Sequence, residues 1–179
     1  MCGIAGLIHR GKSSSVGSEL QQMLQALKHR GPDSTGYALY AENDGLNFIM
    51  RFKVGENVGE GSSSVNEDVS VYDQRKKLVD RMLSDLGARI VKEERLTPYS
   101  FRYEMKYDKD LMEFSQKIES IESVEILSIG KSLELIKDLG DAKVVCDRYE
   151  LDKVNGTHAI GHARMATESG VDIKSAHPF

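Results

Sequence analysis

The second residue of this chain is a cysteine, and its position gives it an unusual chemical option. A small side chain directly after the initiator Met1 allows the methionine to be removed, which would leave Cys2 with both a thiol and a free α-amine. An unperturbed α-amine titrates near pH ~8, so it can act as the base for the thiol of its own residue. The first two residues therefore predict an N-terminal cysteine nucleophile.

Two later segments are rich in residue types that could serve such a nucleophile. Residues 29–36 read HRGPDSTG, and residues 161–170 read GHARMATESG, with AHPF at positions 176–179. Taken alone, Arg164 would be a solvated surface charge, and Cys2 would be a chance cysteine. The joint presence of these two segments and the first six residues reverses those odds.

The hydrophobic pattern predicts the elements that must position these residues. A short strand should run over residues 3–9, directly after Cys2, and a helix over 18–28 with apolar residues at helical spacing. Strands are expected at 35–41 and 46–52, joined as a hairpin through the ENDG turn at 42–45. Another strand, 157–167, should carry the GHAR sequence.

The middle of the chain has a different character and predicts an inserted unit. Residues 55–64 are rich in Gly and Ser and read as a loop or linker. The pattern after it predicts strands and helices in the order βαββαβ, which is typical of a ferredoxin-like unit. These elements are strand 69–72, helix 74–86, strands 89–96 and 100–107, helix 109–121 and strand 124–129, followed by a further helix at 132–139. We therefore expect an insert at 59–153 within a discontinuous host domain, 1–58 and 154–179.

The three chemical segments, with MCGIAG at positions 1–6, resemble the glutaminase domain of class II glutamine amidotransferases, which are N-terminal nucleophile hydrolases. The resemblance covers about residues 1–52 and 157–179 and is closest to the amidotransferase subunit of archaeal-type glutamate synthases. It implies an α+β fold, a partial αββα sandwich, with glutamine as substrate and a synthase subunit as the partner that receives ammonia.

The resemblance also implies roles for individual residues. Cys2 would attack the glutamine side-chain amide, and Arg164 would bind the substrate α-carboxylate. Thr167 and His177 would lie at the substrate, although Thr167 is equally consistent with strand packing.

Arg30, Gly31 and Asp33 would support the Cys2 strand, with a turn salt bridge between Arg30 and Asp33 as the simpler reading. The second cysteine, Cys146, is interpreted as an inert and partly buried thiol.

The family places an Asn-Gly pair and a later aspartate after the AHPF segment, where they form the oxyanion hole and bind the substrate α-amine. This sequence ends at Phe179, before those positions. Loss of one oxyanion donor costs about 10²–10³ in rate. We therefore expect a truncated chain with little glutaminase activity alone, or a second chain that completes it. The alternative function is a catalytically incomplete docking or regulatory module that binds a synthase through the insert.

Composition and charge narrow the possible binding partners and the cellular environment of this chain. The chain has 179 residues, a net charge of -4 and only two cysteines. We expect no nucleic-acid partner, because no basic run is present, and no membrane segment, because no apolar stretch approaches ~18 residues. The cysteine count excludes a disulfide framework and fits a reducing cytoplasm. No metal or cofactor is expected, since no second cluster completes a site with the histidines.

Overall fold

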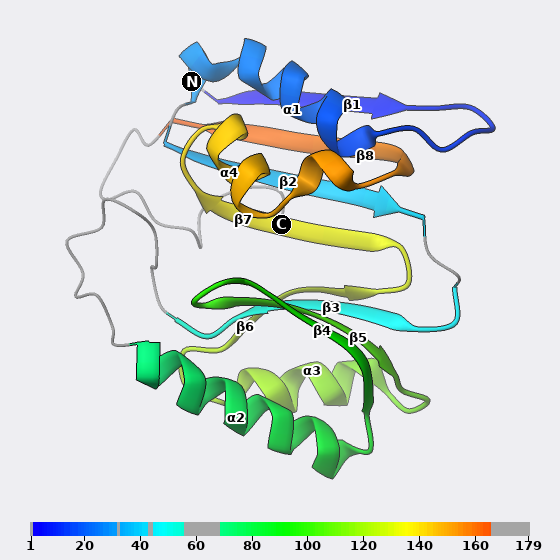
Figure 1. The fold of residues 1–179 in the computed structure, drawn as a ribbon, viewed down its shortest axis with the longest axis vertical. Coiled ribbons are helices and arrows are strands. Elements are labelled where there is room, and N and C mark those ends of the chain that lie inside the picture. The colour runs from blue at the N-terminus through cyan, green and yellow to red at the C-terminus, as the bar shows by residue number, and fades with distance from the viewer. Residues whose placement is uncertain (1, 32, 43–44, 56–68, 166–179) are drawn as a thin grey trace. The chain divides into compact units, whose positions relative to one another are not determined.

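The computed structural model describes residues 2–31, 33–42, 45–55 and 69–165. Contacts within the chain divide it into two units. The described part of the first unit spans 2–42 and 132–165, without residue 32, and that of the second spans 45–55 and 69–131. Each unit is a mixed α/β structure with one four-stranded antiparallel sheet (Figure 1).

The first unit is built from segments that lie far apart in the sequence. Its sheet has the order β1-β8-β2-β7, so the late strand β8 lies between β1 and β2 (Figure 1). The elements are β1 Gly3–Ile8, α1 Val16–Ala26, the short 3-10 helix η1 Lys28–Arg30, β2 Ser34–Ala41, β7 Leu133–Leu139, α4 Ala142–Arg148, η2 Leu151–Lys153 and β8 Gly156–Arg164.

One face of this sheet carries the hydrophobic core of the first unit. Leu20 and Leu24 of α1 are fully buried. They lie so close to Gly161 of β8 that a Cβ there would be 2.6 Å from a Leu24 methyl. On the same face, the Tyr37 hydroxyl donates a hydrogen bond of 2.7 Å to the carbonyl of Ala142, the first residue of α4. Both α1 and α4 therefore pack on this face.

The opposite face of the first sheet shows apolar side chains to solvent. Side chains alternate along a strand, and directly paired residues share a face. Ile4 and Ile8 of β1 are 70% and 79% exposed, and Ile160 of β8, which is paired with Gly6, is 46% exposed. The first sheet thus has one face packed against helices and an opposite face, called the open face below, whose apolar side chains on β1 and β8 are exposed to solvent.

The second unit contains the elements β3 Phe48–Lys53, α2 Val69–Leu86, β4 Arg89–Thr97, β5 Ser100–Lys106, α3 Leu111–Glu119 and β6 Glu125–Gly130. Their order is βαββαβ, and the sheet order is β4-β5-β3-β6. Both helices supply fully buried residues to its core, including Val79 from α2 and Phe114 from α3. These face the aromatic side chains of Phe52, Phe101 and Tyr103, which pack against one another.

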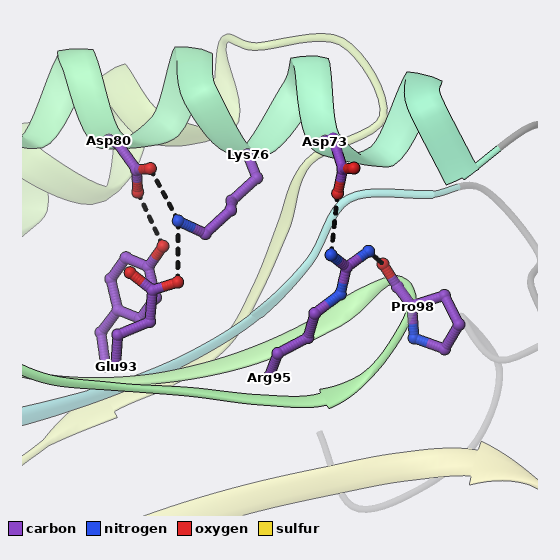
Figure 2. Close-up of polar contacts among 7 residues, drawn as sticks. Asp73, Lys76, Asp80, Glu93, Arg95 and Pro98 are labelled. Atoms are coloured by element: carbon purple, nitrogen blue, oxygen red, sulfur yellow. Dashed lines mark hydrogen bonds and ion pairs between the residues drawn. The ribbon is translucent and has the colours of Figure 1, made fainter.

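Polar contacts fix α2 on the strands below it (Figure 2). The Lys76 ammonium lies 2.8 Å from carboxylate oxygens of both Asp80 and Glu93, and the Tyr103 hydroxyl donates a 2.6 Å hydrogen bond to Asp80. Burial opposes the charge of Lys76, but the hydrogen bonds to the two carboxylates outweigh it and raise the lysine pKa.

A second pair lies one turn away along α2. Arg95 forms an ion pair of 2.8 Å with Asp73 and donates a 2.7 Å hydrogen bond to the Pro98 carbonyl (Figure 2). The two groups of contacts join α2 to β4 at two points along the helix.

Three of the predicted elements are wrong. Residues 69–72 begin helix α2 instead of forming a strand, so the first strand of the βαββαβ order is β3. Residues 132–139 form strand β7 instead of a helix, because their pairing with β2 outweighs their helix propensity. The predicted hairpin does not form, since β2 pairs with β7 and β8 while β3 pairs with β5 and β6.

These differences also change which residues group together. The predicted insert was 59–153, whereas β3 groups with the second unit and β7, α4 and η2 group with the first. Strand pairing is the physical reason, because each strand joins the sheet in which its hydrogen bonds are satisfied.

Candidate functional site

Strand pairing brings two predicted site residues to one end of the first sheet. These are Cys2, the predicted nucleophile, and Arg164, the predicted substrate clamp, which would bind the α-carboxylate. Cys2 is exposed and directly precedes β1, whose first residue, Gly3, pairs with Ala163 of β8. Arg164 is the next residue of β8 and pairs on its other side with Ser34 of β2. Continuing the alternation of each strand places Cys2 and Arg164 on the open face, the side opposite α1.

The HRGPDSTG segment lies against the same strand end. A Cβ on Gly31 would lie 2.4 Å from the carbonyl carbon and oxygen of Ala163 and 2.6 Å from the carbonyl carbon of Arg164. Only a glycine permits this approach of two backbones. The Asp33 N–H donates a 3.1 Å hydrogen bond to the Arg164 carbonyl, which extends the β2–β8 ladder by one bond. Gly31 and Asp33 thus act through their backbones on the residue predicted to hold substrate.

A third segment, which no sequence motif marks, contacts this loop from the other side. The Gly140 N–H, between β7 and α4, donates a 3.0 Å hydrogen bond to the Asp33 carbonyl. The Thr35 hydroxyl donates a 2.8 Å hydrogen bond to the Gly140 carbonyl. Gly140 has φ +112°, a conformation that favours glycine.

The residue after Gly140 adds a charged contact to the same loop. Asp141 Oδ2 lies 2.7 Å from the Lys28 ammonium, and Asp141 Oδ1 accepts hydrogen bonds from the first backbone N–H groups of α4, those of Lys143 and Val144. Partial burial opposes ionisation of Asp141, but the bonds from Lys28 and from the helix N–H groups outweigh it and hold its pKa below the ordinary value.

The open face next to these strands is hollowed into an apolar groove. A cavity of about 570 Å³ lies over β1, β8 and β2. Its floor includes the rings of Tyr40 and His158, which stack with their centroids 3.8 Å apart. The residues that line it are Gly6, Leu7, Ile8, Tyr40, His158, Ala159 and Ile160.

The two cysteines have opposite environments. Cys2 is exposed, whereas Cys146, on α4, is only 2% exposed. Burial, followed by the nearby Asp152 carboxylate, raises the pKa of the Cys146 thiol to about 11. A thiol of this kind is inert near neutral pH, because the thiolate is the reactive form.

The other predicted site residues have different outcomes. Arg30 is exposed at the end of η1, in the same loop as Gly31 and Asp33. Thr167 and His177 lie outside the described residues. Within the described ranges no group of three or more His, Cys, Asp or Glu could hold a metal ion, and no helix of those ranges is long and apolar enough to cross a membrane.

Comparison with known proteins finds similarity to glutamine amidotransferases. Residues 1–50 match the family described as glutamine amidotransferase domain. The chain is 37% identical over its full length to the "Putative glutamine amidotransferase" of Methanothermobacter thermautotrophicus and covers 56% of that protein. It is 29% identical, again over its full length, to the "Glutamine amidotransferase-like protein GlxB" of Rhizobium meliloti and covers 54% of that protein.

The chain therefore spans about half the length of these curated relatives. The segment that matches the domain family contains Cys2, Gly31 and Asp33, which the structure places around the end of β8. The chain is thus similar to glutamine amidotransferases, and the matched residues include Cys2, Gly31 and Asp33 of the candidate site but not Arg164.

Proposed function

We propose that this chain carries the nucleophile and the substrate clamp of a glutaminase, and that the ammonia released passes to a synthase, with glutamate synthesis as the end reaction. One observation supports this most directly. Strand β8 pairs with β1 on one side and β2 on the other, so Arg164 lies at the strand end beside Cys2. A nucleophile and a carboxylate-binding cation are thereby held on one sheet face.

The reaction that we propose has two steps. The Cys2 thiolate attacks the side-chain amide carbon of glutamine, the C–N bond breaks, and the α-amine passes the thiol proton to the departing ammonia. Water then adds to the γ-glutamyl thioester, the C–S bond breaks, and glutamate leaves with the thiol restored. Arg164 holds the substrate α-carboxylate in both steps. A reducing compartment such as the cytoplasm would keep the thiol free.

The fold that we propose is an αββα sandwich of the N-terminal nucleophile type. The first unit has one layer of helices, α1 and α4, and one sheet whose other face exposes Ile4, Ile8 and Ile160. The relatives are nearly twice as long as this chain. A second sheet supplied by the rest of such a protein would cover the apolar face and bring further groups, including an oxyanion hole, next to Cys2.

We propose that the second unit is a ferredoxin-like insert. Its element order, βαββαβ, and its sheet order, β4-β5-β3-β6, are those of the split βαβ arrangement.

The test measures substrate binding at Cys2 and does not depend on turnover. The purified chain is first weighed intact, because a retained Met1 would block the α-amine and contradict the mechanism. Alkylation of Cys2 by iodoacetamide is then followed by mass spectrometry with increasing glutamine. We expect glutamine to slow the alkylation in a saturable way, whereas asparagine, one methylene shorter, should not.

The matched variants separate the clamp from general charge effects. Arg164→Gln should abolish the protection by glutamine, because the bidentate carboxylate pair is lost. Arg10→Gln removes an exposed arginine beyond the other end of β1 and should leave the protection unchanged. If glutamine gives no protection in the parent chain, or if both variants behave alike, the proposed function is wrong.

A further inference from the structure

The turn between β7 and α4 contacts the loop that contains Lys28, Gly31 and Asp33 at several points, although the turn lies outside every motif of the sequence. Its residues Gly140 and Asp141 are followed by the first turn of α4. Building on the proposed function, we infer that Asp141 and its partner Lys28 are positioning residues, which hold Arg164 at the correct place for the substrate carboxylate.

The Asp141 carboxylate has a double role. One oxygen, Oδ1, accepts the N–H groups of Lys143 and Val144 at 3.0 and 3.1 Å, so it caps α4. The other oxygen, Oδ2, binds the Lys28 ammonium at 2.7 Å. The Asp141 side chain is 15% exposed and the Lys28 side chain 51%, so the carboxylate end of this ion pair is shielded from solvent while the ammonium end is open to it.

Two backbone hydrogen bonds connect this turn to Arg164. The Gly140 N–H binds the Asp33 carbonyl at 3.0 Å, and the Asp33 N–H binds the Arg164 carbonyl at 3.1 Å. The peptide groups on either side of Asp33 are thus held by the turn after β7 on one side and by β8 on the other. A displacement of the turn would move Asp33, and with it the backbone of Arg164.

The other end of the loop is held by Lys28. This residue opens η1, which ends at Arg30, and the next residue is Gly31, seated on the backbone of residues 163 and 164. The Lys28–Asp141 pair therefore fixes the start of the loop, and the Asp33–Gly140 bond fixes its end. Both anchors come from the same turn.

The test uses variants that keep the helix cap and remove only the ion pair. Asp141→Asn retains an N-cap oxygen but loses the charge that binds Lys28, and Lys28→Gln removes the same pair from the other side. Lys28→Arg keeps the charge and should behave as the parent. Asp147→Asn is the matched control, because it breaks an exposed pair of 2.6 Å with Lys143 within α4.

Two readouts separate positioning from general stability. We expect Asp141→Asn and Lys28→Gln to weaken glutamine protection of Cys2 by about 3–5-fold, the size of one effective ion pair. The alkylation rate without glutamine should change less than about twofold. Hydrogen exchange of the Asp33 amide should accelerate by a similar factor in both variants and stay unchanged in Lys28→Arg and Asp147→Asn.

The outcomes for the two proposals differ. Parent-like protection and parent-like Asp33 exchange in Asp141→Asn would overturn the positioning role while the proposed glutaminase site stands. Absence of glutamine protection in the parent would overturn the proposed function, and the positioning role with it. An equal loss in Asp147→Asn would show that any disturbance of α4 has this effect, which also overturns the specific role of Asp141.

Discussion

Gly31→Ala is the substitution for which the structure predicts the clearest effect on the candidate site. The φ of Gly31 is −172°, so no left-handed backbone strain enters the argument. The cost comes from space. The new Cβ would lie 2.4 Å from the Ala163 carbonyl group, and an ordinary contact begins at 3.4 Å. The loop and β8 must therefore separate by about 1 Å.

The magnitude follows from what this separation breaks. The Asp33 N–H and the Arg164 carbonyl are 3.1 Å apart, so a shift of this size removes their hydrogen bond. Overpacking against a backbone that cannot rotate away costs about 1–3 kcal/mol, and one lost hydrogen bond adds about 0.5–1.5 kcal/mol. We expect the free energy of opening of the first sheet to fall by about 1.5–4.5 kcal/mol.

The assay is native-state hydrogen exchange of the β8 amides, because a chain with two units need not unfold in one step. The control is Gly6→Ala, also in the first sheet, where the nearest atom to the new Cβ is the Ala159 carbonyl oxygen at 3.4 Å. That variant should change the opening free energy by less than about 0.5 kcal/mol. If Gly31→Ala differs from Gly6→Ala by no more than this amount, the close backbone contact is not what fixes the loop.

Two further predictions concern buried groups of the first unit. Burial raises the pKa of Cys146 to about 11, so iodoacetamide at pH ~8 should modify Cys2 at least about 100-fold faster than Cys146 in the native chain. In urea the two cysteines should react at comparable rates. Peptide mass spectrometry measures both rates. Comparable native rates would contradict the burial of Cys146. The Asp138 side chain is fully buried, 2.7 Å from the Tyr149 hydroxyl and 3.1 Å from the Arg148 guanidinium. Asp138→Ala should therefore destabilise the first unit by about 3–5 kcal/mol, and Tyr149→Phe by about 1–2 kcal/mol. Hydrogen exchange of the β7 amides measures both effects. Equal effects of the two variants would show that the loss of the buried charge adds nothing to the loss of one hydrogen bond.

Local patterns predicted most elements of the structure. The strand after Cys2 is expected at 3–9 and observed as β1, Gly3–Ile8, and the strand with GHAR is observed as β8, Gly156–Arg164. Regular alternation and helical spacing depend on short stretches of sequence, so they can be recognised without the partner.

Two of the three wrong predictions concern structure that depends on distant partners. Residues 132–139 combine Leu, Glu and Lys, which favour helix, and only their pairing with β2 makes them a strand. The ENDG sequence at 42–45 is typical of a hairpin turn, yet the strands before and after it, β2 and β3, join different sheets. Local turn chemistry shows that the chain can reverse, but not which strand it will pair with.

The candidate site was predictable only in part for the same reason. Motif residues identified Cys2 and Arg164, and the structure adds the strand pairing that brings them to one sheet end. The contact of Thr35 with Gly140 joins residues 105 positions apart. No motif pairs these two residues, and their spacing has no periodic signal, so this half of the loop's support could be found only in the folded chain.

The points where the chain leaves and re-enters the first unit have a consequence for folding order. The Ala41 N–H donates a 2.9 Å hydrogen bond to the Ser132 carbonyl, so the points where the chain leaves and re-enters the first unit adjoin. Within the second unit, Ile49 and Gly130 are paired across β3 and β6, so its own ends also adjoin.

If the second unit folds first, the pairing of β2 with β7 no longer has to close a loop of about 90 residues but one of about 10, which lowers the entropic cost by roughly 2 kcal/mol. The second unit would then hold the ends of β2 and β7 together, and the sheet that carries the candidate site would form faster with it than with an unstructured linker of equal length.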